Sequence, residues 1–297
     1  MNITSHSNRT LSLIRNNLRH TENALAKSTL KIAEGRRITR AADDAAGMSV
    51  AVRMKTDLVS EKQVSRNIND GMSLLQTAEG GISQQLNILV RIRELQIQAM
   101  NETYTTNDLE MIQNEMDTLI TEGTRISTTN NYNETTLLNR NNLGPLVFDG
   151  VIEFQVNADA GNTISIDLDD FNTNSLFSTL STNVSGGRAT GTGAFSALPN
   201  ALKRTFKQTS LTTIDTTFAR LNTMRGSLGS VQNRLETALS ESQTKASNLT
   251  AAHSTIMDAN MAEEITNQTQ LLIRRDAGVA ALSQAKSLSE SVIRLIG

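Results

Sequence analysis

Aliphatic residues recur at seven-residue intervals near both ends of the chain. The repeated positions are Leu11, Leu18, Leu25, Ile32, Ile265, Leu272, Val279 and Ile293. One aliphatic residue every two turns gives a helix a narrow apolar stripe, which is typical of coiled coils. We therefore expect a helix at each end, and we expect these eight residues to pair the two helices with each other and with neighbouring molecules.

The same spacing predicts long helices further inside. It is shown by Ile68, Leu75, Ile82 and Leu89, and again by Ile214, Leu221, Leu228 and Leu235. Gly35 interrupts the first terminal pattern, so we expect a bend or short connector there. The first set predicts a helix from about residue 48 to 100. Asn107 and Glu110 have the spacing of a capping box, so we expect a second helix to begin there and return antiparallel to the first.

Alternation replaces the helical period in the middle of the chain. Ile152, Phe154 and Val156 alternate with polar residues, as do Ile164, Ile166 and Leu168, and residues 157–162 between them have turn chemistry. This pattern predicts a β-hairpin. Residues 172–200 are rich in Ser, Thr, Asn and Gly, and we expect an exposed loop or a very small outer element.

Composition favours an extended architecture. Only 38% of the 297 residues are hydrophobic and 3% aromatic, and every aromatic residue and proline lies between Tyr104 and Phe218. We predict a mainly α fold, an elongated antiparallel helical bundle or coiled coil with a small β-hairpin region and paired terminal helices. The expected domains are residues 1–42 with 256–297, residues 43–170 with 205–255, and a short exposed insertion at 171–204.

The chain has no cysteine, which excludes disulfides, thiolate metal sites and cysteine nucleophiles, and its charge argues against another function. The formal net charge of -2 argues against nucleic-acid binding by the whole chain, although residues 1–40 carry a local balance of +6. A basic amphipathic helix of this kind is typical of binding to a membrane surface, to nucleic acid or to an acidic protein partner, and it is also typical of a solvated face on a packed helix. Neither a signal peptide nor an apolar run of ~18 residues occurs, so we expect no membrane insertion. The chain either stays in the cytoplasm or leaves by a route without a cleaved signal.

Catalytic constellations are missing from the sequence. His6, His20 and His253 are isolated, and no spacing indicates a metal site, a bound cofactor or a catalytic nucleophile. Adjacent carboxylates at Asp43 and Asp44 would point about 100° apart on a helix, so a structural role near a helix start fits them better. We therefore predict that the protein is not an enzyme.

Several blocks resemble bacterial flagellin, in the right order along the chain. GRRITRAADDAAG at 35–47 is similar to the family's GLRINSAADDAAG, and FQVNADAGNTISIDL at 154–168 to its FQVGANAGQTISV strand pair. Further similar blocks lie at 65–71, 76–80, 91–95, 228–235, 256–264 and 276–296. The resemblance covers about residues 1–170 and 210–297.

This resemblance implies a structural subunit that polymerises into the flagellar filament for swimming motility, outside the cell. Residues 1–42 and 256–297 would form its inner tube, and 43–170 with 205–255 a rod domain. The family's partners would be other copies of the chain, an export chaperone, the type III export apparatus, and hook-junction and cap proteins. A host Toll-like receptor would contact Arg91, Leu95 and Glu115. The alternatives are a hook–filament junction protein and a cytoplasmic coiled-coil scaffold.

Overall fold

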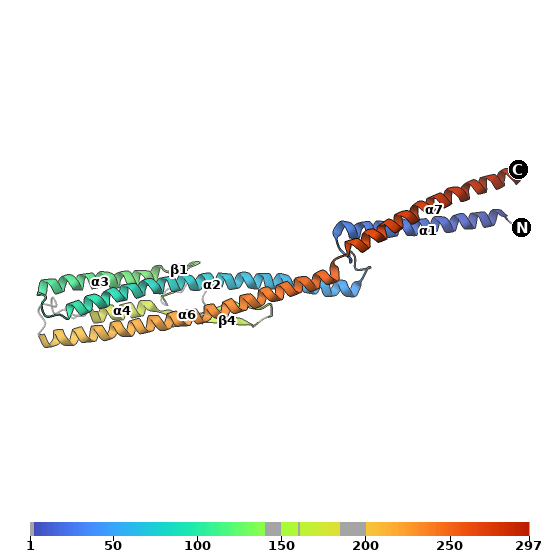
Figure 1. Ribbon diagram of the computed structural model, residues 1–297. Helices are drawn as coiled ribbons and strands as arrows, with labels where there is room; N and C mark the ends of the chain where they lie inside the picture. The colour runs from blue at the N-terminus through green and yellow to red at the C-terminus, as the bar shows by residue number, and fades with distance from the viewer. Residues whose placement is uncertain (1–2, 140–149, 160, 185–199, 297) are drawn as a thin grey trace. The chain divides into compact units, whose positions relative to one another are not determined.

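The computed structural model describes residues 3–139, 150–159, 161–184 and 200–296, and the chain divides into two compact units (Figure 1). Unit 1 comprises Met1–Val59 and Ala246–Gly297, and unit 2 comprises Ser60–Lys245. The two longest helices, α2 (Ala45–Ala99) and α6 (Asn200–Met257), contribute to both units. The predicted mainly α fold with long helices is confirmed.

Unit 1 pairs the two terminal helices, α1 (Ile3–Glu34) and α7 (Met261–Ile296), in antiparallel orientation (Figure 1). Gly35 ends α1 in the left-handed region, at φ +66°, and the Arg36 amide donates to the Lys31 carbonyl at 3.2 Å. This is a Schellman-type end, for which glycine is suited because it carries no Cβ. The sequence correctly predicted a break at Gly35.

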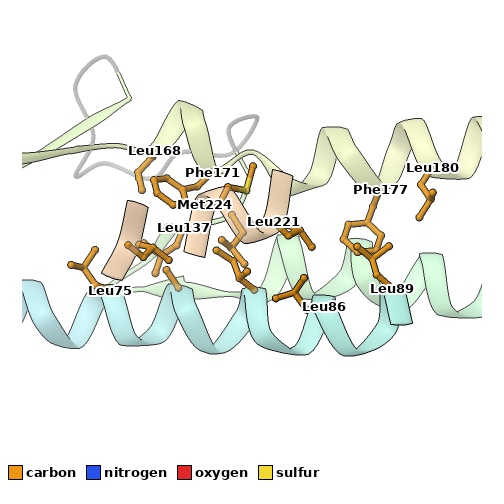
Figure 2. Packing of buried hydrophobic residues seen from close by; sticks show 14 of the residues in the cluster. Leu75, Leu86, Leu89, Leu137, Leu168, Phe171, Phe177, Leu180, Leu221 and Met224 are labelled. Carbon is orange, nitrogen blue, oxygen red and sulfur yellow. The ribbon is translucent and has the colours of Figure 1, made fainter. Parts of the chain in front are cut away.

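Unit 2 contains the main hydrophobic core, shown in Figure 2. The seven-residue stripe on α2 is fully buried, and so is the corresponding stripe on α6. The residues with 0% exposure in these stripes are Ile68, Leu75, Ile82, Leu89, Ile214, Leu221 and Leu235. Helix α3 (Thr106–Thr129) runs back beside α2 and adds Met116 and Ile120 to the core. The predicted antiparallel return is therefore confirmed.

The start of α3 differs from the sequence-based expectation. The N-cap is Thr105 and its capping-box partner is Asp108, rather than Asn107 and Glu110. The Thr105 amide donates to the Asp108 carboxylate at 3.0 Å, and the Asp108 amide donates to Thr105 Oγ1 at 3.3 Å. Both residue pairs have the three-residue spacing of a capping box, so the sequence cannot tell which pair caps the helix. The backbone conformation after the turn determines it.

Two antiparallel strand pairs accompany the helices. In the predicted hairpin, β3 (Val151–Gln155) pairs with β4 (Thr163–Asp167), and Phe154 lies opposite Ile164. Phe154 also fills the space left by Gly71 on α2, where an added Cβ would lie 2.9 Å from its ring. A smaller pair, β1 (Asn131–Tyr132) with β2 (Thr135–Thr136), was not predicted.

The expectation that residues 171–204 are a surface-exposed insertion is wrong for the first part of that segment. After the 3-10 helix η2 (Leu168–Phe171), helix α4 (Thr173–Val184) packs on α3. Phe177 is 0% exposed and lies against Gly123, where an added Cβ would clash with its ring. One aromatic and one aliphatic side chain with helical spacing are enough to bury one face of a helix that is otherwise rich in Ser and Thr. Residues 185–199 lie outside the described residues.

The unit boundaries also differ from the domain boundaries expected from the sequence. The units divide after Val59 and after Lys245, within continuous helices. The expected boundary at 42/43 lies instead in the connector between α1 and α2, and the one at 255/256 lies two residues before the end of α6. Those expected domains describe layers of a filament. They stay a prediction for the assembled state.

Candidate assembly surfaces

The contact between α1 and α7 is a half-buried seam rather than a core. All four predicted positions on α1 lie in it, together with Leu272 on α7, and each keeps part of its surface exposed. Leu18 lies beside Gly278, where an added Cβ would be 3.2 Å from its side chain. A seam of this width gives a helix pair only modest stability in water.

Helix α7 also carries aliphatic side chains that α1 leaves at least half exposed, at the edge of the seam and beyond it. Ile265 and Val279 are each 50% exposed and Ile273 is 64% exposed. The seven-residue spacing of Ile265, Leu272 and Val279 thus follows the edge of the seam rather than its centre. The predicted self-assembly position Ile293 lies in α7, but its side chain is outside the described ones.

Exposed aliphatic side chains also occur elsewhere in unit 1. Leu13 on α1 is 58% exposed, and Val52 and Val59 on α2 are 55% and 58% exposed. Aliphatic residues aligned on exposed helix faces are typical of surfaces that pack against another molecule. These three were not predicted from the sequence. Leu13 lies outside the register of Leu11 and Leu18, and Val52 and Val59 are seven residues apart but the spacing does not continue to a third aliphatic residue after them.

The connector between α1 and α2 is held by polar contacts. The Arg37 amide donates to the Met257 carbonyl at 2.7 Å, and the Arg37 guanidinium donates to the Ile256 carbonyl at 2.8 Å. Below this, Ile38 packs with Ala51 and Met257 in a small buried cluster. The connector therefore joins the end of α1 to the end of α6.

Asp43 and Asp44 have the structural role that their position predicted. The Asp43 carboxylate accepts from the Thr39 hydroxyl at 3.0 Å and from the amides of Thr39 and Arg40. The hydrogen bond from the Thr39 side chain is the main cause that lowers the pKa of Asp43. Asp44 instead caps α2, because its Oδ1 accepts from the Gly47 amide at 2.8 Å.

The structure places Arg91 and Glu115 together at the surface of unit 2. The Arg91 guanidinium lies 2.7 Å from Glu115 Oε1 across α2 and α3, and 3.2 Å from Glu94 Oε2. These hydrogen bonds, with Glu115 first, raise the pKa of Arg91. Leu95 does not share this surface, since it is 2% exposed and packs into the core. Arg91 and Leu95 lie about one turn apart on α2, and the sequence did not show that one is exposed and the other buried.

A shallow apolar groove of about 450 Å³ lies between α2 and α6. Val90 and Ile97 stand half-exposed on one wall and Phe218 on the other. The ion pair of Arg93 with Asp215, at 2.9 Å, crosses the rim. Because these two charges neutralise each other, the groove presents mainly an apolar surface.

An ion pair between a buried glutamate and a half-exposed lysine was not predicted from the sequence. The Glu61 side chain is 2% exposed, and its Oε1 lies 2.6 Å from the Lys245 ammonium. Ser242 Oγ donates to Glu61 Oε2 at 2.9 Å, and Lys245 donates to Asn157 Oδ1, in the turn of the hairpin, at 3.1 Å. One lysine thus ties α2, α6 and the β3–β4 turn together. No local motif distinguishes this glutamate from the many exposed ones.

Neither a metal cluster nor a membrane span emerges from the part of the chain that the structure describes. No group of three His, Asp or Glu side chains in those residues is arranged to hold a metal ion. No helix within the same residues combines the length and apolar character needed to cross a membrane.

Comparison with known proteins identifies the family. Two family patterns match the chain. The one described as bacterial flagellin N-terminal helical region matches residues 6–143, and the one described as bacterial flagellin C-terminal helical region matches residues 211–296. This chain belongs to the bacterial flagellin family. It is also similar to a flagellin of Halalkalibacterium halodurans, with 32% identity over 91% of each chain.

Two further similarities agree with this assignment. A flagellar filament 30.7 kDa core protein of Treponema maltophilum is 32% identical over 90% of each chain. The solved structure of a putative flagellar hook-associated protein from Vibrio parahaemolyticus has a TM-score of 0.60, covering 73% of this chain and 100% of that one, at 13% identity. The second similarity shows a shared fold only.

The family settles the function in outline. Flagellins are structural proteins, and this chain is a filament subunit that polymerises with its own copies and serves motility. The two alternatives left open by the sequence, a junction protein and a cytoplasmic scaffold, fit these relatives less well. The surfaces that make the intersubunit contacts are a separate question.

Proposed function

We propose that this flagellin assembles into its filament chiefly through the face of α7 that α1 leaves uncovered. The observation that carries the proposal is the exposure of Ile265, Ile273 and Val279 along one helix of a half-buried pair. Open helical polymers require contacts between two different faces of the subunit. A helix pair with apolar side chains on its outer side gains burial only when another copy covers them.

The face is tested by replacing its aliphatic side chains. Substituting Ile265→Ser together with Val279→Ser is expected to abolish polymerisation of the purified chain onto filament seeds, measured by sedimentation and electron microscopy. The matched control is Thr266→Ser with Thr269→Ser on the same helix, which leaves the apolar side chains in place and should polymerise normally. Normal filaments from the first variant would contradict the proposal.

Export is part of the same proposal. We infer that the chain leaves the cell through the flagellar type III apparatus by means of its uncleaved amino-terminal region, and that a chaperone covers α7 before export. The motifs shared with flagellins support the route, and the uncovered apolar face of α7 supports the need for a chaperone. Hook-junction and cap proteins would contact the ends of the polymer.

The export step is tested by truncation. A chain without residues 1–20 should accumulate inside the cell and be missing from sheared surface material. Secretion of the truncated chain at the level of the intact one would contradict the role given to that region. Placing the same truncated chain on seeds in vitro separates a failure of export from a failure of assembly.

Recognition by a Toll-like receptor rests on the Arg91–Glu115 pair alone, because Leu95 is not accessible in this unit. Arg91→Ala is expected to lower the signal of receptor reporter cells exposed to purified monomer. Arg125→Ala, which breaks a comparable exposed pair with Glu122 on α3, is the control. An equal response to both variants would argue against a contact at Arg91.

A further inference from the structure

A polar groove of about 420 Å³ lies between α1 and α7 in unit 1. Lys27 and Lys31 stand one turn apart on its α1 wall, and Arg274 stands on its α7 wall. The amide side chains of Asn267 and Gln270 also line it. The groove is therefore lined by three cations and by two further sets of N–H donors.

These cations lack close acidic partners. Within the described side chains, none of Lys27, Lys31 and Arg274 forms a salt bridge. Glu264 contributes a carboxylate to the lining, so the groove as a whole carries a formal charge of about +2. The charge of Lys27 is the smallest of the causes that lower the pKa of Asp43.

The helix pair is held weakly at this level. Ser28 is 4% exposed, yet its hydroxyl reaches the Glu264 carbonyl only at 3.5 Å, the outer limit of a hydrogen bond. On the other flank, Gln268 donates to Thr29 Oγ1 at 3.1 Å. Polar contacts replace apolar burial here, and the repulsion between like charges on the two helices works against their pairing.

We propose that this groove binds an inorganic oxyanion of the phosphate class, and that the anion stabilises the pairing of α1 with α7. A guanidinium and two ammonium groups are the side chains that bind such anions most strongly, through charge-assisted hydrogen bonds. The site exists only when the two helices are paired, so anion binding shifts the chain ends toward the paired state. The proposal concerns contacts within one chain and does not depend on the proposed function.

The test uses the full-length monomer, kept below the concentration at which it polymerises. Amide hydrogen exchange of α1 and α7 is measured in sodium phosphate and in sodium chloride at equal ionic strength, and broadening of the ³¹P signal of phosphate reports binding directly. We expect phosphate to slow exchange in both helices at least about threefold relative to chloride, while unit 2 is unchanged.

Matched variants separate this site from general effects of salt. Lys27→Gln, Lys31→Gln and Arg274→Gln together should remove both the phosphate effect and the ³¹P broadening. Arg9→Gln, Arg15→Gln and Arg19→Gln remove the same charge from exposed positions of α1 outside the groove, and should keep both. Lys27→Arg with Lys31→Arg keeps the charge and should also keep both, which shows that a loss in the first variant follows from the missing charge.

Three results would overturn the proposal. The first is an equal effect of phosphate and chloride, and the second is a phosphate effect that survives in the groove variant. The third is an effect seen only after polymerisation, since the groove within a single chain would then not be the binding site.

Discussion

The two units contain similar aliphatic stripes but bury them to different extents. In unit 2 the aliphatic stripes of α2 and α6 are fully buried, because α3, α4 and the β3–β4 hairpin supply the surfaces that cover them. In unit 1 the seam between α1 and α7 leaves the aliphatic residues of α1 half-exposed, Ile265 and Val279 of α7 lie at its edge, and the buried cluster there is small. A similar seven-residue repeat thus forms a closed core in unit 2, whereas in unit 1 it leaves apolar side chains exposed.

The difference indicates a division of roles. A unit with a closed core is stable on its own, whereas a unit with an open apolar face gains stability from its neighbours. Unit 2 should therefore fold in the monomer, and unit 1 should become ordered during polymerisation. Four predictions test this comparison.

The largest expected effect is in the core of unit 2. Phe177→Ala removes a fully buried ring that fills the space beside Gly123, and should lower the free energy of unfolding by about 3–5 kcal/mol. Urea denaturation of the monomer, followed by circular dichroism, measures it. Leu18→Ala in the half-buried seam should change the same unfolding transition by less than about 1 kcal/mol. Equal losses would remove the distinction between the units.

The second prediction concerns local opening in the monomer. Amides of α1 and α7 should exchange with deuterium about a hundredfold faster than amides at the centre of α2, because their helices bury less apolar surface. In the filament the two sets should become similarly protected. Circular dichroism and exchange data that show fully protected terminal helices in the monomer would contradict the proposed role of polymerisation.

The third prediction concerns the ion pair between Glu61 and Lys245. Lys245→Met leaves a buried carboxylate without its cation and should cost about 2 kcal/mol, less than for a fully buried pair because the lysine is half-exposed. Urea denaturation measures this loss, and Lys62→Met on the exposed side of α2 is the control. Glu61→Leu combined with Lys245→Met should recover most of it, since both charges are then removed.

The smallest effect is at the start of α3. The pKa of Asp108 is lowered, mainly by the hydrogen bond from the Thr105 side chain, so the ionised form is favoured in the folded state. Its contribution is present above the unfolded pKa of 3.8 and is lost as the pH falls through the folded value. Thermal unfolding of Asp108→Asn should show a weaker decline between pH 5 and about pH 3 than the unchanged chain. An identical decline in both would contradict this role.

The sequence predicted the elements that depend on local patterns. The stripe of Leu75, Ile82 and Leu89 gave the long helix, and the alternation around Phe154 gave the hairpin with its correct strands. The break at Gly35 also followed from one residue, because glycine tolerates the left-handed conformation there. These signals are local because each arises from backbone geometry over a few residues.

The candidate site was predicted less completely. Seven-residue spacing located α7, but could not tell that Ile265 and Val279 lie beside the seam with α1 while Leu272 lies within it. Leu95 matched a family surface, yet its side chain points into the core. The rotation of a helix about its axis depends on which neighbour packs against it, and that neighbour is distant in the sequence.

By itself, the sequence determined where helices and strands form, that the two ends can pair, and to which family the chain is similar, because periodicity and motif order are written residue by residue. Only the tertiary structure decided which stripe is covered. It buried Phe177 in a segment whose composition predicted exposure, joined Glu61 to Lys245 across 184 positions, and left one face of α7 open. Burial depends on the partners that surround a residue in three dimensions, and no local pattern specifies them.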